Sequence, residues 1–184
     1  MRRDIVWERL DRAGLEHVTV IEAEEIRVES LVLLADQGGL IVLRYRLVCD
    51  ADWRTRAASF RMERNGSSQG VEIARDGDDW RVDGRPRPDL AGCFDIDISA
   101  TPLTNTMPVR RLGLAADESR AIRVVYLRVP DMSVSLGEQT YTRLDPATPP
   151  RRFRYDSPGF TAEVAFDEHG LVEDYPPVWR RRTA

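Results

Sequence analysis

The sequence predicts an all-β protein, and three observations lead to this prediction. Turn-forming pairs such as Asn65-Gly66, Asp83-Gly84 and His169-Gly170 recur about every ten residues, a spacing typical of β-meanders, rolls and barrels. The segments between these turns are rich in β-branched and aromatic residues, which favour strands. No window of about a dozen residues shows sustained helical periodicity. We therefore expect ten or more strands, mostly antiparallel, with one or two short helical turns at residues 8–13 and 115–119.

Strands are expected at residues 26–34, 40–49, 55–62, 69–74, 93–99, 121–129, 133–144, 161–166 and 171–175. In residues 93–99 and 161–166 the bulky apolar side chains share one face of the strand, so the other face is expected to be exposed to solvent. Residues 40–49 and 122–129 are apolar on both faces, which predicts that both faces are covered. This mixture indicates a sheet rolled back on itself, and a small rolled sheet either fills its interior or holds one ligand.

Length and composition predict one domain spanning residues 1–184. With 42% hydrophobic and 32% charged residues, the chain belongs with globular rather than disordered proteins. The net charge of −4 gives no overall field that would attract nucleic acid, so no nucleic-acid partner is expected. All 27 basic residues are Arg, which excludes Schiff-base chemistry and phosphate-binding loops that need Lys.

The chain shows no apolar window long enough to cross a bilayer, and residues 1–10 lack the apolar core of a signal peptide. These features predict a cytoplasmic protein without a transmembrane segment. Cys49 and Cys93 lie at strand-like positions among apolar neighbours, where buried free thiols are expected rather than a disulfide.

Metal, cofactor and nucleophile signals are weak. The only histidines, His17 and His169, lie far apart in the sequence, and no paired Cys spacing is present. A zinc site needs three or four clustered ligands, and no nucleophile elbow of the Gly-x-Ser-x-Gly type occurs. The sequence therefore predicts neither a metal site nor a cofactor.

The stretch from residue 76 to residue 112 gathers most of the candidate site. It carries carboxylates on a strand, a polar turn and an Arg pair, and flat amphipathic rings elsewhere in the chain complement them. Aromatic rings beside Asp, Asn and Arg suit a ligand with hydroxyl groups and apolar faces. The candidate ligand-binding residues are Trp53, Arg54, Arg56, Trp80, Asp95, Asp97, Thr104, Asn105, Arg110, Arg111 and Tyr141.

Asp95 and Asp97 allow three interpretations. Standing two residues apart on a strand, their Cα atoms are separated by roughly 6.6–7 Å, within the roughly 6.5–9.5 Å carboxylate separation of inverting glycosidases. However, they project side by side from one wall instead of facing each other across a bond. Structural pairing with Arg110 and Arg111, or with Arg54 and Arg56, and hydrogen bonding to a ligand are the other two interpretations.

At these residues the chain resembles the putative glycolipid-binding family. The matching segments are residues 43–45, 49–56, 95–98, 101–112, 139–141, 154–155 and 170–176, in order along nearly the whole chain. The resemblance implies a spiral β-roll, remotely similar to bacterial lipoprotein-localisation carriers, which enclose an acyl chain in a curved sheet.

Three functions follow as hypotheses. The first is a non-enzymatic binding protein that holds an amphipathic small molecule, such as a glycolipid, in an apolar cavity. The mouth of this cavity is expected to carry Trp53, Asp95, Asp97, Asn105 and Arg110 or Arg111. The second is a hydrolase that acts on a sugar or ester through Asp95 or Asp97, for which a carboxylate with a raised pKa in a cleft is expected. The third is an interaction module whose one-sided sheet face forms a homodimer or recruits a partner.

Overall fold

The computed structural model describes residues 1–145 and 151–182, and its dominant feature is one 15-stranded sheet. The strands follow the order β8-β7-β6-β5-β4-β3-β2-β1-β15-β14-β13-β12-β11-β10-β9. They are β1 (Arg2–Arg9), β2 (Gly14–Glu22), β3 (Ile26–Asp36), β4 (Gly39–Cys49), β5 (Thr55–Arg64), β6 (Ser67–Asp76), β7 (Asp79–Val82), β8 (Arg85–Pro86), β9 (Asp95–Ile98), β10 (Ser119–Arg128), β11 (Ser133–Arg143), β12 (Arg151–Ser157), β13 (Phe160–Phe166), β14 (Val172–Tyr175) and β15 (Trp179–Arg182). The predicted all-β class is confirmed.

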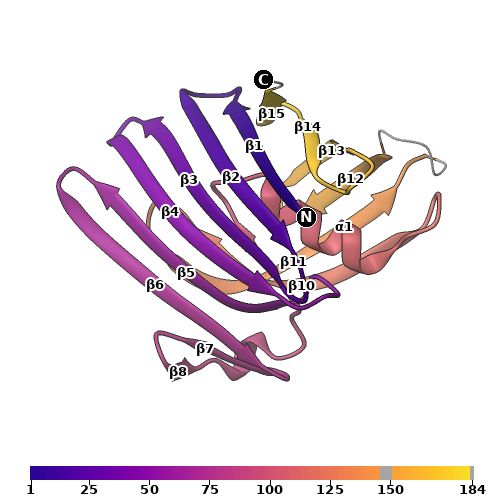
Figure 1. Cartoon of the computed structure of the whole chain (residues 1–184), viewed down its shortest axis with the longest axis horizontal. Coiled ribbons are helices and arrows are strands. Elements are labelled where there is room, and N and C mark those ends of the chain that lie inside the picture. Colours follow the sequence, from indigo (N-terminus) through magenta and orange to yellow (C-terminus); the bar gives the residue numbers. More distant parts are fainter. Residues whose placement is uncertain (146–150, 183–184) are drawn as a thin grey trace.

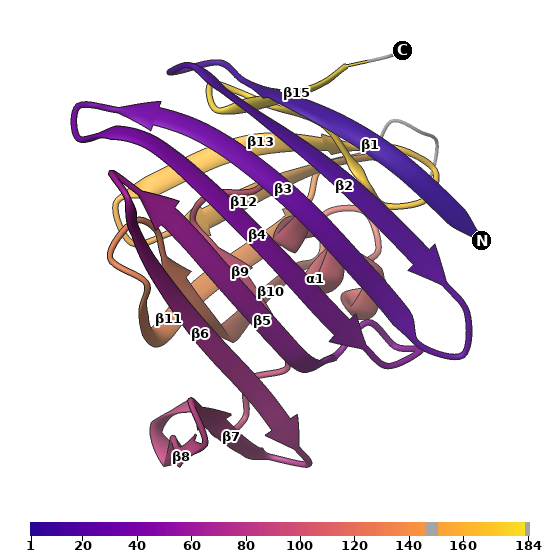
Figure 2. The same ribbon diagram turned by 60° about the vertical axis from the view of Figure 1, so that its left-hand side comes forward.

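The sheet curls so that its two halves face each other (Figures 1 and 2). Strands β1–β6 form one wall and β9–β13 the opposite wall, with the helix α1 (Thr106–Leu112) between them. A hydrogen bond of 2.9 Å from the Thr55 amide to the Phe94 carbonyl joins the start of β5 to the residue before the edge strand β9. The predicted spiral β-roll is therefore present, although the described sheet is not closed.

All strand pairs are antiparallel except β9 and β10, which run parallel. Local sequence explains several hairpins. Asn65 and Gly66 have φ angles of 51° and 77°, and Asp83 and Gly84 have 49° and 74°. Two successive left-handed residues form the tight turn whose twist matches that of paired strands, and Asn-Gly and Asp-Gly adopt it readily.

The wall β1–β6 buries its inner side chains and exposes its outer ones. On β2, Glu16, Val18 and Val20 are buried, whereas Leu15 and His17 are exposed. Alternation of this kind is what a half-buried strand requires. The predicted cover on both faces of residues 40–49 is wrong, because Leu40, Arg44 and Arg46 face solvent. On β10, Val124 and Val125 are both buried, so both faces are covered at these two residues, whereas Arg123 and Arg128 are exposed.

The helix in the roll was not predicted. The sequence predicts a polar turn before the Arg pair, yet a 3₁₀ turn, η2 (Leu103–Asn105), leads directly into α1. Pro108 is tolerated because the first amides of a helix have no intrahelical acceptor. Gly113, with φ of 57°, ends the helix. Residues 8–13 and 115–119, both described, form strand ends and turns instead of helical turns.

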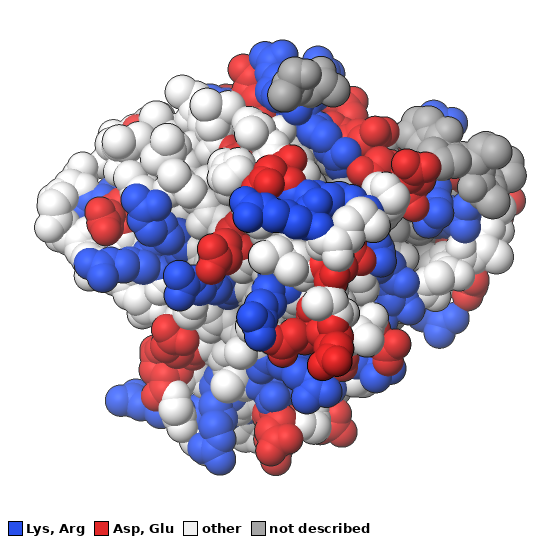
Figure 3. Space-filling view, viewed as in Figure 1, with Lys and Arg blue, Asp and Glu red and all other residues white. Residues whose placement is uncertain are grey.

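The core is one cluster that runs along the inside of the roll, and it includes both cysteines as free thiols, as predicted. Trp7 and Trp80 are fully buried, and their indole N–H groups donate to the carbonyls of Val172 at 2.9 Å and Cys93 at 3.2 Å. Figure 3 shows charges of both signs interspersed over one face, with a largely uncharged area over the upper-left ends of the first strands.

Met107 connects the helix to the first wall of the roll. Its side chain is buried, and its sulfur lies 3.7 Å from the Cys49 sulfur and 3.8 Å from the Thr55 hydroxyl oxygen. We expect Met107→Ala to lower the free energy of unfolding by about 2–5 kcal/mol, because it leaves a cavity between helix and sheet. Met107→Leu, the matched control, should cost less than about 1.5 kcal/mol. Urea denaturation measures both, and equal small losses would contradict this packing.

Candidate functional site

The candidate site is a pocket of about 760 Å³ inside the roll. Its walls come from β9, η2, β10, β11, the β12–β13 hairpin, β14, β15 and the end of β1, so both halves of the chain contribute. The size falls within the range of about 300–1,000 Å³ typical of small-molecule sites. Polar side chains form the floor, aromatic rings form the wall, and the rim is exposed.

Asp97 is the central polar group of the floor. Its Oδ1 accepts a hydrogen bond of 2.7 Å from the Thr104 hydroxyl, and its Oδ2 accepts one of 2.7 Å from the Gln139 side-chain amide. Thr104 in turn accepts from the Ile98 amide at 3.3 Å. Burial raises the pKa of Asp97, and the two hydrogen bonds oppose this effect.

Asn105 continues the floor from η2. Its Oδ1 accepts a 2.9 Å hydrogen bond from the Tyr141 hydroxyl, and its amide donates to the Pro102 carbonyl at 3.1 Å. Tyr141 is fully buried behind Asn105 and packs against Tyr155, with ring centroids 5.3 Å apart. Both Asn105 side-chain atoms therefore have partners, and the amide is held in one orientation.

The wall is aromatic. Tyr155, Phe160 and Tyr175 form a triangle whose ring centroids are 6.1–6.2 Å apart, with interplanar angles of 58–70°. Tyr126 and Trp179 also line the pocket. Burial raises the pKa of Tyr155 and Tyr126, and in both cases the charge of Asp97 raises it further. The phenols are therefore neutral, and they lie close enough to Asp97 to respond to its charge.

The rim is more exposed and partly apolar. Leu136 and Phe160 are each 37% exposed and line the pocket. Arg9 lies over the Trp179 ring at 5.0 Å and pairs with Asp11 at 2.6 Å. The sequence predicted an apolar cavity with polar residues at its mouth. Instead, polar groups lie on the floor of the pocket, and the rim combines the apolar Leu136 and Phe160 with exposed charged side chains.

The carboxylate of Asp95 lies outside the pocket. It is buried and forms two hydrogen bonds with Arg111, at 3.1 Å and 2.5 Å. Burial raises its pKa, and Arg111 opposes the shift. Arg111, Arg54 and Arg75 also surround the Phe94 ring at 5.4, 5.5 and 4.8 Å. This cluster ties the end of α1 to the edge strand β9, as ion pairing from the sequence suggested for Asp95.

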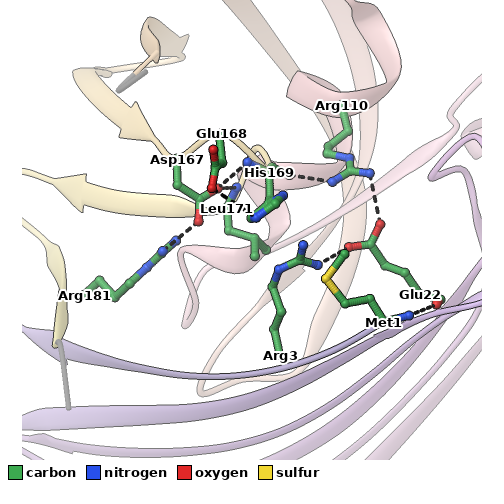
Figure 4. Close-up of polar contacts among 9 residues, drawn as sticks. All are labelled: Met1, Arg3, Glu22, Arg110, Asp167, Glu168, His169, Leu171 and Arg181. Atoms are coloured by element: carbon green, nitrogen blue, oxygen red, sulfur yellow. Dashed lines mark hydrogen bonds and ion pairs between the residues drawn. The ribbon is translucent and has the colours of Figure 1, made fainter. Parts of the chain in front are cut away.

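Arg110 belongs to a second network, which connects the helix to the N-terminal strands (Figure 4). It pairs with Glu22 at 3.0 Å and donates to the His169 carbonyl at 2.5 Å. Glu22 also pairs with Arg3 at 2.6 Å. The Arg110 guanidinium lies 4.7 Å from the centroid of the Trp53 ring. The network therefore joins α1 to β1, β2 and the β13–β14 turn.

The structure thus separates the predicted site residues into groups. Asp97 and Asn105 line the pocket, and Thr104 and Tyr141 support them from behind. Trp53, Arg110, Arg111 and Asp95 form the two ion-pair networks. Trp80 is a core residue hydrogen-bonded to Cys93, Arg54 pairs with Asp52 at 3.3 Å, and Arg56 lines a separate surface hollow with Asp50.

Sequence reasoning missed Glu16, a carboxyl with 0% exposure on the inner face of β2. Its Oε1 accepts hydrogen bonds from the Tyr45 hydroxyl at 2.6 Å and the Ser30 hydroxyl at 2.7 Å, whereas Oε2 is buried without a partner in the described residues. The Tyr45 hydroxyl also lies 3.2 Å from that of Thr101, which lines the pocket. The signal was available, because Glu16 shares the face of Val18 and Val20.

The fold and the pocket together define a β-roll protein with an internal, aromatic-lined cavity. Residues 4–181 match the family described as "Putative glycolipid-binding", and the chain belongs to that family. A solved structure of a DUF1089 family protein from Pseudomonas aeruginosa is similar throughout, with 35% sequence identity, a TM-score of 0.81 and 92% of each chain covered. No curated protein matches the sequence. Within the described residues, no helix is long and apolar enough to cross a membrane.

Glu16 makes folding stability depend on pH. Burial raises the pKa of its carboxyl from 4.5 to about 7, and the neighbouring hydroxyls of Thr101, Tyr45 and Ser30 only partly oppose the shift. An acid with a raised pKa stabilises the folded state fully below its unfolded pKa, and this stabilisation is lost as the pH rises through the folded pKa. The loss between pH 4.5 and pH 7 is on the order of 3 kcal/mol.

We therefore expect Glu16→Gln to gain stability relative to the wild type as the pH rises from 4.5 to 7.5. Gln keeps the oxygen that accepts from Tyr45 and Ser30 but cannot ionise. Denaturant unfolding at several pH values measures the difference between the two proteins. A difference that does not change with pH would show that Glu16 titrates normally.

Proposed function

We propose that this protein binds a glycolipid-like amphipathic ligand in the pocket, with the polar head group on the floor and the apolar chain leaving along the rim. Membership of the family supports a binding role. The arrangement of the pocket is the observation that supports an amphipathic ligand with its head group on the floor. Asp97, Asn105 and Gln139 converge on one end of a space whose other wall consists of aromatic rings.

The floor offers what a hydroxylated head group needs. The Asp97 oxygens accept one hydrogen bond each from Gln139 and Thr104, and ionised carboxylate oxygens have capacity for more. Thr101 and Ser99 add hydroxyls to the same lining. Because these side chains are fixed by partners inside the protein, they require little reorganisation when a ligand binds.

The wall suits the apolar faces of such a ligand. Tyr155, Tyr175 and Trp179 combine large apolar area with few rotatable bonds, so ring contacts cost little conformational entropy. Phe160 and Leu136 extend the apolar surface to the exposed rim. An acyl or alkyl chain that leaves the pocket along these two residues would bury their exposed area.

A pocket-blocking variant tests the proposal. Ser135 is exposed, lines the pocket and is located on β11. We expect Ser135→Trp to weaken binding of octyl glucoside at least about tenfold, because the indole occupies the ligand's path. Ser68→Trp, at an exposed strand position on β6, is the matched control and should bind normally. Isothermal titration measures both affinities, and equal affinity of the two variants would contradict the site assignment.

A hydrolase acting on a sugar or ester is the second candidate, and one observation favours it. Asp97 faces the pocket with a pKa raised by burial, as a general acid requires. Asp95, the proposed second carboxylate, instead pairs with Arg111 outside the pocket. Turnover of a panel of aryl glycosides and esters by the wild type, abolished in Asp97→Asn, would support this candidate. Absence of turnover by the wild type would eliminate it for these substrates.

A further inference from the structure

Asp97 is half-buried and has no cationic partner, whereas Asp95 on the same strand is buried and has one. Asp95 has the guanidinium of Arg111 at 2.5 Å. Asp97 accepts hydrogen bonds only from the neutral side chains of Thr104 and Gln139, and in the part of the chain that the structure describes no Arg or His forms an ion pair with it. A carboxylate that is partly withdrawn from water without a countercharge carries a desolvation cost, which a cationic ligand would offset.

The surroundings of Asp97 favour a cation over other partners. The charge of Asp97 raises the pKa of Tyr141, Tyr126, Tyr155 and Tyr175, each after the larger effect of burial, so four phenol rings lie within its field. Tyr126, Tyr155 and Tyr175 line the pocket beside Asp97. Aromatic faces attract cations, and rings combined with a carboxylate form the usual site for ammonium groups.

Three other charged residues line the pocket, namely Arg9, Arg128 and Glu138. Arg9 is engaged with Asp11 and with the Trp179 ring. Arg128 is an exposed residue at the end of β10, and Glu138 is exposed on β11. None of these groups contacts Asp97 among the described interactions, so the charge on the floor is open to compensation by a ligand.

We propose that the pocket selects amphiphiles whose head group carries a protonated amine or a quaternary ammonium, which pairs with Asp97. The inference rests on the proposed function, since it specifies the head group of the ligand that the pocket holds. The aromatic triangle of Tyr155, Phe160 and Tyr175 contacts the head group beside the cation. The apolar chain follows Phe160 and Leu136 to the rim.

The test compares ligands that differ only in the polar group. Octylamine, which is protonated at pH 7, and octanol share the same chain and are titrated separately into the wild type, and octyl glucoside is titrated as the reference for amphiphile binding. We expect octylamine to bind on the order of tenfold more tightly than octanol, because a hydrogen-bonded ion pair exceeds a neutral hydrogen bond.

Two variants test whether Asp97 is the residue that causes the preference for octylamine over octanol. In Asp97→Asn the ratio of the octylamine affinity to the octanol affinity should fall to near one, because the charge that pairs with the amine is gone. Asn keeps an acceptor for Thr104, and rotation of the Gln139 amide supplies an acceptor for the new N–H₂ group. Glu138→Gln removes an exposed carboxylate from the same pocket and should retain the preference, because rim charges are screened by solvent.

The outcomes separate this inference from the proposed function. Equal affinity of the wild type for octylamine and octanol, with octyl glucoside still blocked by Ser135→Trp, would overturn the ammonium inference alone. No binding of any of the three ligands would overturn both. Retention of the amine preference in Asp97→Asn, or its loss in Glu138→Gln, would contradict the role of Asp97. If Asp97→Asn does not fold, the wild-type ratio of the two affinities decides the case.

Discussion

The parallel pairing of β9 with β10 is the constraint around which the rest of the roll is arranged. Antiparallel neighbours can be joined by a tight turn, but parallel neighbours need a crossover over one face of the sheet. Here the crossover contains η2 and α1 and passes over the inner face, between the two walls. The roll is therefore filled along this part of its interior, and the pocket occupies the part that the crossover leaves free.

The crossover places polar backbone and side-chain groups inside the core, where each of them needs a hydrogen-bond partner. The crossover meets this requirement largely through contacts with both walls, and the Thr106 hydroxyl of α1 is buried without a hydrogen-bond partner in the described residues. Arg111 pairs with Asp95 on β9, Arg110 pairs with Glu22 on β2, and Thr104 donates to Asp97. The same side chains that anchor the crossover thus determine where the polar floor of the pocket lies.

The sequence predicted most strands because their residues alternate between core and solvent, and it predicted the hairpins that need left-handed Asn-Gly and Asp-Gly pairs. It did not predict α1, because Thr106, Pro108 and Val109 have weak helix propensity and the helix is stabilised by its buried surroundings. The strands β1, β2, β7, β8, β12 and β15 were also not predicted. In β12 only Phe153 and Tyr155 mark the buried face. In both cases tertiary packing outweighed local preference.

The candidate site could be predicted only in part for a related reason. Asp97 and Asn105 are close in the sequence, and the sequence analysis predicted both as site residues. Tyr175 and Trp179 reach the pocket only because the pairing of distant strands brings them there. Local spacing carries no information about such register. The alternation of residues along the strand also could not assign different roles to Asp97, which faces the pocket, and Asp95, which pairs with Arg111. Both occupy the same face of one strand.

The most direct test of the central claim, that the roll holds an amphipathic ligand in its internal pocket, is a crystal structure of the protein saturated with octyl glucoside. The account predicts the glucose ring against Tyr155 and Tyr175, with a hydroxyl within hydrogen-bond distance of Asp97, and the octyl chain along Phe160. An empty pocket with the ligand bound on the outer face of β1–β6 would contradict it.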